Sequence, residues 1–149
     1  MIKLIRTNSS NSDFSKLVKH LDAYLAKIDG DEHDFYAQFN KINALQYVVV
    51  AYENDQPISC GAIKQVGNGS MEVKRMYTLP EYRGKGIATR VLLELEQWAK
   101  ELSYDQCVLE TGKRQPEAIR LYEKNGYQLI PNYGQYVGVE NSLCFGKWL

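Results

Sequence analysis

The sequence lacks three features that would each point to a different class of protein. Its 18 lysines and arginines balance 18 aspartates and glutamates, so the net charge is zero, which argues against a general nucleic-acid or membrane binder. It has no apolar run near the roughly 20 residues of a transmembrane helix. Its first residues lead into a short strand rather than a signal peptide. We therefore expect a soluble cytoplasmic protein without nucleic-acid or membrane partners.

Cysteine is also scarce, and its placement argues against a disulfide framework or a metal centre. Cys60, Cys107 and Cys144 are odd in number, and their spacing matches no common set of metal ligands. Each lies in a strand-like run, where a thiol behaves as a small buried apolar group. Repeats, linkers and low-complexity segments are missing too. We expect one domain over residues 1–149, with no bound metal.

Along the chain, the spacing of the apolar residues alternates between that of helices and that of strands. Apolar residues at helical spacing between Phe14 and Ile28 predict a helix ending at Gly30, and those between Ile87 and Leu102 predict a second long helix. Pro116 and Gly126 are placed to begin and end a third. Runs of β-forming residues predict strands at 2–6, 46–53, 57–66, 71–78, 106–110, 127–130 and 142–148. This order predicts an α+β fold, a mixed, mostly antiparallel central sheet with helices on both faces.

The stretch Arg83-Gly84-Lys85-Gly86-Ile87-Ala88 is the most informative part of the chain. It follows a strand-like run and opens a helix, where unpaired backbone amides and the positive end of the helix dipole form an anion site. Its spacing fits neither the Walker loop nor the dinucleotide fingerprint. It does fit the pattern Arg/Gln-x-x-Gly-x-Gly/Ala.

Two later segments strengthen this reading, because with the loop they stand in the order of one known family. Leu109-Glu110-Thr111-Gly112 and, after it, Leu121-Tyr122-Glu123-Lys124-Asn125-Gly126-Tyr127 follow the glycine loop. Together the three segments resemble the GNAT superfamily of N-acetyltransferases, whose order of elements the chain matches almost throughout. The resemblance implies a GNAT-like fold and acetyl-CoA as co-substrate. It also implies direct acetyl transfer in a ternary complex, without a metal or a covalent enzyme intermediate.

The resemblance also implies which residues bind acetyl-CoA. Loop amides would hold the pyrophosphate, and free backbone groups of the preceding strand would pair with the pantetheine arm and polarise the thioester carbonyl. Gln115 stands where the family usually has asparagine, and it has a longer reach. The implied contacts are Met76, Tyr77, Thr78, Arg83, Gly84, Lys85, Gly86, Ile87, Ala88 and Gln115.

Two residues are candidates for proton transfer. Tyr122 corresponds to the family's tyrosine that protonates the departing thiolate; by periodicity alone it is an apolar-face residue of a helix. Glu72 precedes Arg83 by eleven residues, the spacing at which some family members carry a glutamate base. An alkylammonium acceptor must lose a proton before it attacks. The alternatives are a water chain, or a solvent-facing Glu72 paired with Lys74.

The acceptor is less well specified. A weaker helix is expected over residues 32–41, and the acidic residues 31–34 with nearby aromatic residues would favour a cationic, partly apolar amine if they faced the cleft. The aromatic loop 133–138 either covers the acceptor or packs across a homodimer interface. We expect a primary amine, a small molecule or amino-acid-like acceptor. The alternatives are a protein or peptide N-acetyltransferase and a non-catalytic acyl-CoA-binding regulatory module.

Overall fold

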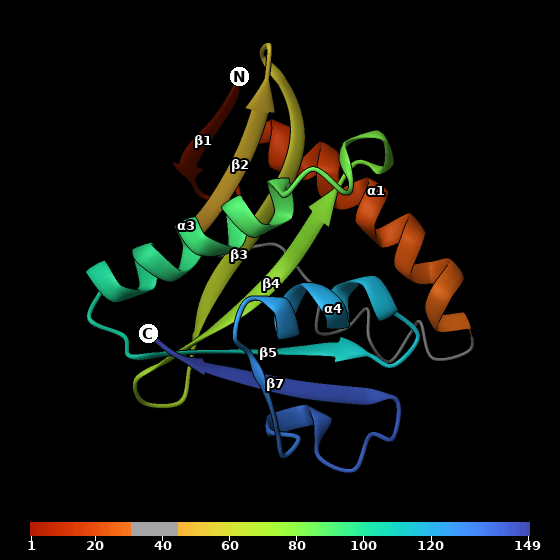
Figure 1. Cartoon of the computed structure of the whole chain (residues 1–149), viewed down its shortest axis with the longest axis vertical. Coiled ribbons are helices and arrows are strands. Elements are labelled where there is room, and N and C mark those ends of the chain that lie inside the picture. Colours follow the sequence, from red (N-terminus) through yellow and green to blue (C-terminus); the bar gives the residue numbers. More distant parts are fainter. Residues whose placement is uncertain (31–44) are drawn as a thin grey trace.

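A seven-stranded sheet forms the centre of the computed structural model, which describes residues 1–30 and 45–149 (Figure 1). The strand order is β1-β2-β3-β4-β5-β7-β6, and β4 and β5 are the parallel pair in an otherwise antiparallel arrangement. The strands are β1 (Ile2–Thr7), β2 (Tyr47–Glu53), β3 (Gln56–Val66), β4 (Ser70–Thr78), β5 (Gln106–Gly112), β6 (Gln128–Ile130) and β7 (Ser142–Trp148). The predicted fold class is confirmed.

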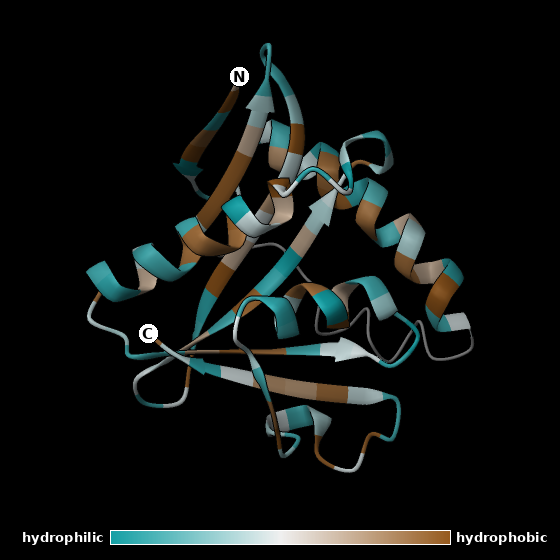
Figure 2. Cartoon of the chain, in the orientation of Figure 1, coloured by the Kyte–Doolittle hydropathy of each residue, from teal (hydrophilic) through white to brown (hydrophobic). Residues whose placement is uncertain are grey.

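Helices cover both faces of this sheet because neighbouring strand residues point to opposite sides. On one face, α1 (Ser12–Asp29) packs apolar side chains such as Phe14 against Val48 and Val50. On the other face, α3 (Ile87–Glu101) packs Leu95 and its neighbours against Val49. The short helix α4 (Pro116–Lys124) follows β5. Figure 2 shows apolar residues concentrated on the strands and on one side of α1 and α3.

Local signals explain where the helices begin and end. The Asn11 side chain accepts a hydrogen bond of 2.9 Å from the Phe14 amide and so caps α1. Gly30 follows the last residue of α1, as predicted. Pro116 occupies the first turn of α4, and Gly126, with φ of 90°, follows its end.

The most consequential feature of the sheet is a bulge in β4. Cys60 of β3 pairs with Tyr77 and Ala62 pairs with Lys74, so Arg75 and Met76 together lie opposite a single β3 residue. Arg75 adopts φ of 58°, a conformation that bends and twists a bulged strand. β4 pairs with β5 at Ser70–Glu72 and then diverges from it, as Figure 1 shows. The strand before the glycine loop is therefore splayed from β5 over its second half.

Three further expectations concern the cysteines, the segment 31–41 and transmembrane helices. Cys60, Cys107 and Cys144 are buried as free thiols, as expected. The expected helix over residues 32–41 and the acidic and aromatic residues 31–39 lie outside the described residues. None of the helices in the described part of the chain has both the length and the apolar character of a transmembrane segment.

Candidate functional site

The glycine loop joins the open end of β4 to α3. Gly84 and Gly86 have φ of 77° and 78°, a left-handed conformation that favours glycine. A Cβ atom on either residue would meet nothing within 4 Å, so the loop borders open space. Within the described chain, no backbone carbonyl accepts a hydrogen bond from the amides of residues 84–86, and the first turn of a helix leaves its amides unpaired. The loop thus has the donors that a pyrophosphate needs.

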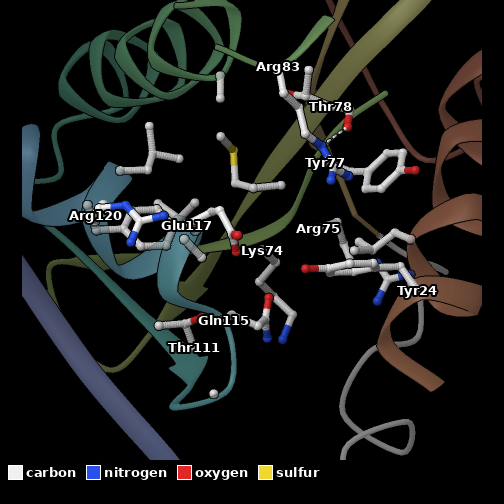
Figure 3. Close-up of a pocket in the computed structure, with 18 of the residues that line it drawn as sticks. Tyr24, Lys74, Arg75, Tyr77, Thr78, Arg83, Thr111, Gln115, Glu117 and Arg120 are labelled. Atoms are coloured by element: carbon white, nitrogen blue, oxygen red, sulfur yellow. Dashed lines mark hydrogen bonds between the residues drawn. The ribbon is translucent and has the colours of Figure 1, made fainter. Parts of the chain in front are cut away.

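A cavity of about 630 Å³ extends from this loop, between the diverging strands, to the second half of α1. Figure 3 shows Tyr24 of α1 on one side of it and Glu117 and Arg120 of α4 on the other. Lys85 is the one predicted site residue that does not line the cavity. Its ammonium lies 5.4 Å from the ring centroid of Tyr82. The predicted residues that do line the cavity are Glu72, Met76, Tyr77, Thr78, Arg83, Gly84, Gly86, Ile87, Ala88, Gln115 and Tyr122.

Tyr122 reaches the cavity from α4. The residue is 7% exposed, and its ring packs edge-on against Tyr127 with centroids 5.7 Å apart. Among the described residues its hydroxyl has no hydrogen-bond partner. Burial raises the pKa of Tyr122, with a further contribution from the charge of Glu110, so the hydroxyl keeps its proton at neutral pH. Tyr122 is therefore both an apolar-face residue and a protonated group at the cavity wall.

Glu72 is buried in the cavity wall, at 4% exposure, so the expectation of a solvent-facing carboxylate is wrong. Its Oε2 accepts a hydrogen bond of 2.5 Å from the Tyr133 hydroxyl. Its Oε1 accepts one of 3.3 Å from Lys74 Nζ, so the expected pairing with Lys74 is present. Each oxygen of Glu72 is thus already engaged by a donor.

Glu110 is a second carboxylate at the site, which our sequence reasoning did not select. It lies on β5 where that strand has separated from β4, and it lines the same cavity as Glu72 and Tyr122. Burial raises the pKa of Glu110 to about 7; the charges of Glu72 and Asp29 add to this, and a hydrogen bond from Ser142 opposes it. That bond, from Oγ to Oε2, measures 2.7 Å. Glu110 therefore changes its charge near neutral pH.

The loop between β6 and β7, residues 131–141, positions both carboxylates. The Asn132 amide donates to the carbonyl oxygens of Tyr136, Val139 and Ser142 at 3.0, 3.2 and 3.1 Å, which ties the loop together. From this unit Tyr133 donates to Glu72, and Ser142, at the start of β7, donates to Glu110. Tyr136 is buried and lines the cavity. The loop thus lies along one side of the cavity.

Arginines and tyrosines form the opposite side. Arg83 Nε donates a 2.9 Å hydrogen bond to the Thr78 carbonyl, and its guanidinium lies 5.5 Å from the ring centroids of both Tyr24 and Tyr77 (Figure 3). Arg75 is buried and forms an ion pair with Asp22 of α1. These contacts tie the second half of α1 to β4 beside the cavity.

Lys113 and Arg114 lie between the end of β5 and the start of α4. Arg114 Nη1 donates to the carbonyls of Ile28 and Asp29 at 3.1 and 3.0 Å, so this side chain closes the end of α1. Neither residue lines the cavity, whereas Arg120 and Lys124 of α4 do. Helix α4 therefore adds two cations to the cavity, which Lys74, Arg75 and Arg83 of the β4 side also line.

Comparison with known proteins gives concordant results. Residues 14–127 match the acetyltransferase (GNAT) family. An uncharacterized N-acetyltransferase of Escherichia coli is 38% identical over 86 residues, 56% of this chain and 52% of that protein. An IAA acetyltransferase of Azospirillum brasilense is 32% identical over 129 residues, 81% of this chain and 80% of that protein. The chain thus spans about half the length of the first relative and most of the second.

Solved structures share the fold over the whole chain. A putative acyl-CoA N-acyltransferase of Klebsiella pneumoniae has a TM-score of 0.84 and 27% identity, over 100% of this chain and 98% of that one. The PaiA N-acetyltransferase of Thermoplasma acidophilum, solved in complex with coenzyme A, has a TM-score of 0.74 and 18% identity, over 100% and 99% of the two chains. With the glycine loop, the splayed strands and the match over residues 14–127, these findings show that the chain belongs to the acetyltransferase (GNAT) family.

Proposed function

We propose that this protein is an N-acetyltransferase that moves an acetyl group from acetyl-CoA to a primary amine of a small, amino-acid-like molecule, by direct attack in a ternary complex. One observation carries the proposal. Tyr122, Glu110 and Glu72 line a single cavity at the point where β4 and β5 separate, next to the unpaired amides of the glycine loop. A donor site and the groups for two proton transfers are thus found together.

Residues of the described chain fit acetyl-CoA, which supplies the acetyl group as a thioester. The amides of residues 84–88 would hold the pyrophosphate, aided by the dipole of α3. The edge of β4 at Met76, Tyr77 and Thr78 faces the gap left by β5 and would pair with the pantetheine amides. Arg120 and Lys124 at the rim would add positive charge near the phosphates.

The two proton transfers are assigned to different groups. We infer that Glu110 takes the proton of the acceptor ammonium, since a base is most effective when its pKa lies near the working pH. Glu72, held by Tyr133 and Lys74, would then attract the ammonium. Tyr122 keeps its proton and would give it to the departing thiolate. The base assignment of Glu72 made from the sequence stays a prediction, and it competes directly with Glu110.

The alternatives differ in what they require of the same cavity. A protein or peptide acetyltransferase needs an opening through which a polypeptide can reach the site, and the loop 131–141, held by Asn132 and bonded to Glu72 through Tyr133, lies on that side. A regulatory module that only binds acyl-CoA has no use for a buried carboxylate that titrates near neutrality beside a protonated tyrosine. The proposed enzyme uses both groups.

A thiol-release assay tests the proposal. The enzyme is incubated with acetyl-CoA and a panel of amines, amino acids, peptides and folded proteins, and free CoA and the acetylated product are both measured. We expect turnover with small amines. Turnover confined to peptides or proteins would favour the enzymatic alternative. Binding of acetyl-CoA by calorimetry, without product from any acceptor, would favour the regulatory module.

A further inference from the structure

A second cavity adjoins the first. Its volume is about 830 Å³, and it lies between β3, the start of β4, β5 and the loop 131–141. Glu72 and Lys74 stand in the walls of both cavities, so the two meet at this pair. Glu72 and Lys74 thus form the part of the wall that the two cavities share.

Positive side chains outnumber negative ones in the wall of the second cavity. Among the described residues that line it, Lys64, Lys74 and Glu72 carry charge, which leaves one positive charge in excess. Polar groups without charge make up much of the rest of the wall: Gln65, Ser70, Gln106, Tyr133 and Gln135. The first cavity differs in that its wall holds Glu110 in addition to Glu72, on the same cavity as Tyr122.

Lys64 is the source of the unbalanced charge. It lies directly opposite Glu72 in the antiparallel pairing of β3 and β4, so their side chains share one face of the sheet. Glu72 is nevertheless engaged by Lys74 and Tyr133. Within residues 1–30 and 45–149, no carboxylate lies within ion-pair distance of the exposed Lys64 ammonium.

We propose that the acceptor carries a carboxylate as well as its amine, and that Lys64, beside Lys74, binds this carboxylate in the second cavity while the amine lies at Glu110. The proposal rests on the function proposed above and specifies the class of its substrate: a free amino acid or a short peptide with a free carboxyl terminus. In this arrangement Glu72 and Glu110 meet the ammonium, and Lys64 meets the carboxylate.

The charge of the second cavity favours acceptors that carry a carboxylate over simple amines. A monoanion in the second cavity neutralises the excess positive charge of that cavity, whereas an amine without a carboxylate leaves the charge without a counter-charge. A ligand carboxylate near Glu72 would be repelled if no cation lay between, and Lys74, 3.3 Å from Glu72, occupies that place. An internal lysine of a protein has no carboxylate to offer, so this arrangement also argues against protein side chains as acceptors.

The test compares three forms of each acceptor: the L-amino acid, its carboxamide, and the amine without the carboxyl group. A dipeptide series distinguishes an amino acid from a short peptide. The variants are Lys64→Gln, Lys64→Glu and the charge-preserving Lys64→Arg, with Lys100→Gln on α3, outside both cavities, as matched control. Calorimetric binding of acetyl-CoA and the melting temperature are recorded for each variant.

We expect the carboxylate form to be the best substrate. Lys64→Gln should raise KM for that form alone, by about three- to fivefold, as for a solvent-exposed ion pair, and Lys64→Glu by about tenfold or more. Lys64→Arg should restore KM, and high ionic strength should weaken the preference for the carboxylate. Acetyl-CoA binding should not change.

Three results would overturn the proposal. The first is equal activity on acid, carboxamide and plain amine, and the second is a loss in Lys64→Gln that is the same for all three; both leave the N-acetyltransferase function intact. The third is the absence of any amine acceptor despite tight acetyl-CoA binding, which removes the proposed function together with this inference.

Discussion

Replacing Glu110 by glutamine tests the catalytic assignment and has two consequences that can be calculated from one pKa. Burial raises the pKa of Glu110 from 4.5 to about 7. Glutamine keeps nearly the same shape and can still accept the 2.7 Å hydrogen bond from Ser142, but it cannot take a proton. The variant therefore removes the titration while leaving the packing largely unchanged.

The first consequence concerns stability. A carboxyl group whose pKa is higher in the folded state than in the unfolded state costs stability as the pH rises. For Glu110 the cost begins near pH 4.5 and is complete above about pH 7. At about 1.4 kcal/mol for each pH unit, this interval amounts to about 3 kcal/mol as an upper bound, because the side chain is not fully buried. Glu110→Gln should thus be more stable than wild type at pH 8 and equal to it at pH 4.

The second consequence concerns activity. If Glu110 accepts the amine proton, kcat/KM of the wild type should rise with pH through an apparent pKa near 7, and Glu110→Gln should lose about 10²- to 10⁴-fold near neutrality. The loss should shrink as the pH approaches the pKa of the acceptor, about 10 for an alkylamine. The assays are a pH series of thiol release and urea unfolding at pH 4 and pH 8.

Glu72→Gln is the comparison that separates the two carboxylates. The charge of Glu72 helps to raise the pKa of Glu110, so removing this charge should shift the rise of kcat/KM with pH (its acid limb) to lower pH without abolishing that rise. If the acid limb instead disappears in Glu72→Gln and persists in Glu110→Gln, then Glu72 is the base and the assignment of that role to Glu110 is refuted.

Two further substitutions address the donor side. Tyr122→Phe removes a hydroxyl that has no hydrogen-bond partner among the described residues, so kcat should fall by about 10²- to 10⁴-fold while the melting temperature and acetyl-CoA affinity hardly change; unaltered turnover would leave Tyr122 as a packing residue. Gly86→Asp places a carboxylate in the phosphate loop and should weaken acetyl-CoA binding severely in calorimetry. Gly138→Asp is its control, since Gly138 also has positive φ, 80°, and open space around it; equal binding by Gly86→Asp and wild type would refute the phosphate-loop assignment.

Much of the fold could be predicted because periodicity and end signals agree in this chain. The apolar stripe of residues 14–28 lies between the Asn11 cap and Gly30, and the structure gives α1 those limits to within two residues. The strand 142–148 was likewise predicted at its observed bounds. In α1 one face is buried, so the pattern in the sequence and the packing in the structure carry the same information.

Glu110 is a residue of the candidate site that the sequence pattern did not identify. A single acidic residue in an apolar strand is compatible with several roles. Glu110 lines the cavity because β4 and β5 have separated at its position. The two strands are unpaired beyond Glu72, and the bulge that follows has an arginine, Arg75, in the left-handed conformation, for which arginine carries no signal. One clue was available: alternation places Glu110 on the face of β5 opposite to the buried Cys107 and Leu109.

The acceptor side was least predictable because it is assembled from segments far apart in the chain. Tyr133 and Glu72 are 61 positions apart, yet their hydrogen bond fixes the carboxylate between the two cavities. The Asn132 amide, which holds the loop that carries Tyr133, follows a proline and reads as an ordinary turn residue. Contacts of this kind depend on how β6 and β7 place the loop, and sequence spacing does not encode that placement.

The bulge in β4 links the two halves of the proposed reaction. The pairing of β4 with β5 ends at Glu72 and the bulge follows at Arg75 and Met76, so the backbone edge of Met76 to Thr78 on the β5 side is not used by the sheet and is available to a ligand. The same divergence leaves Glu110 facing a cavity rather than a neighbouring strand. The proposed roles in donor binding and in proton removal therefore both depend on the separation of β4 from β5. A change that straightened β4 at Arg75 would impair acetyl-CoA binding and the pH dependence of turnover together, whereas changes at Gly86 or Glu110 should affect one without the other.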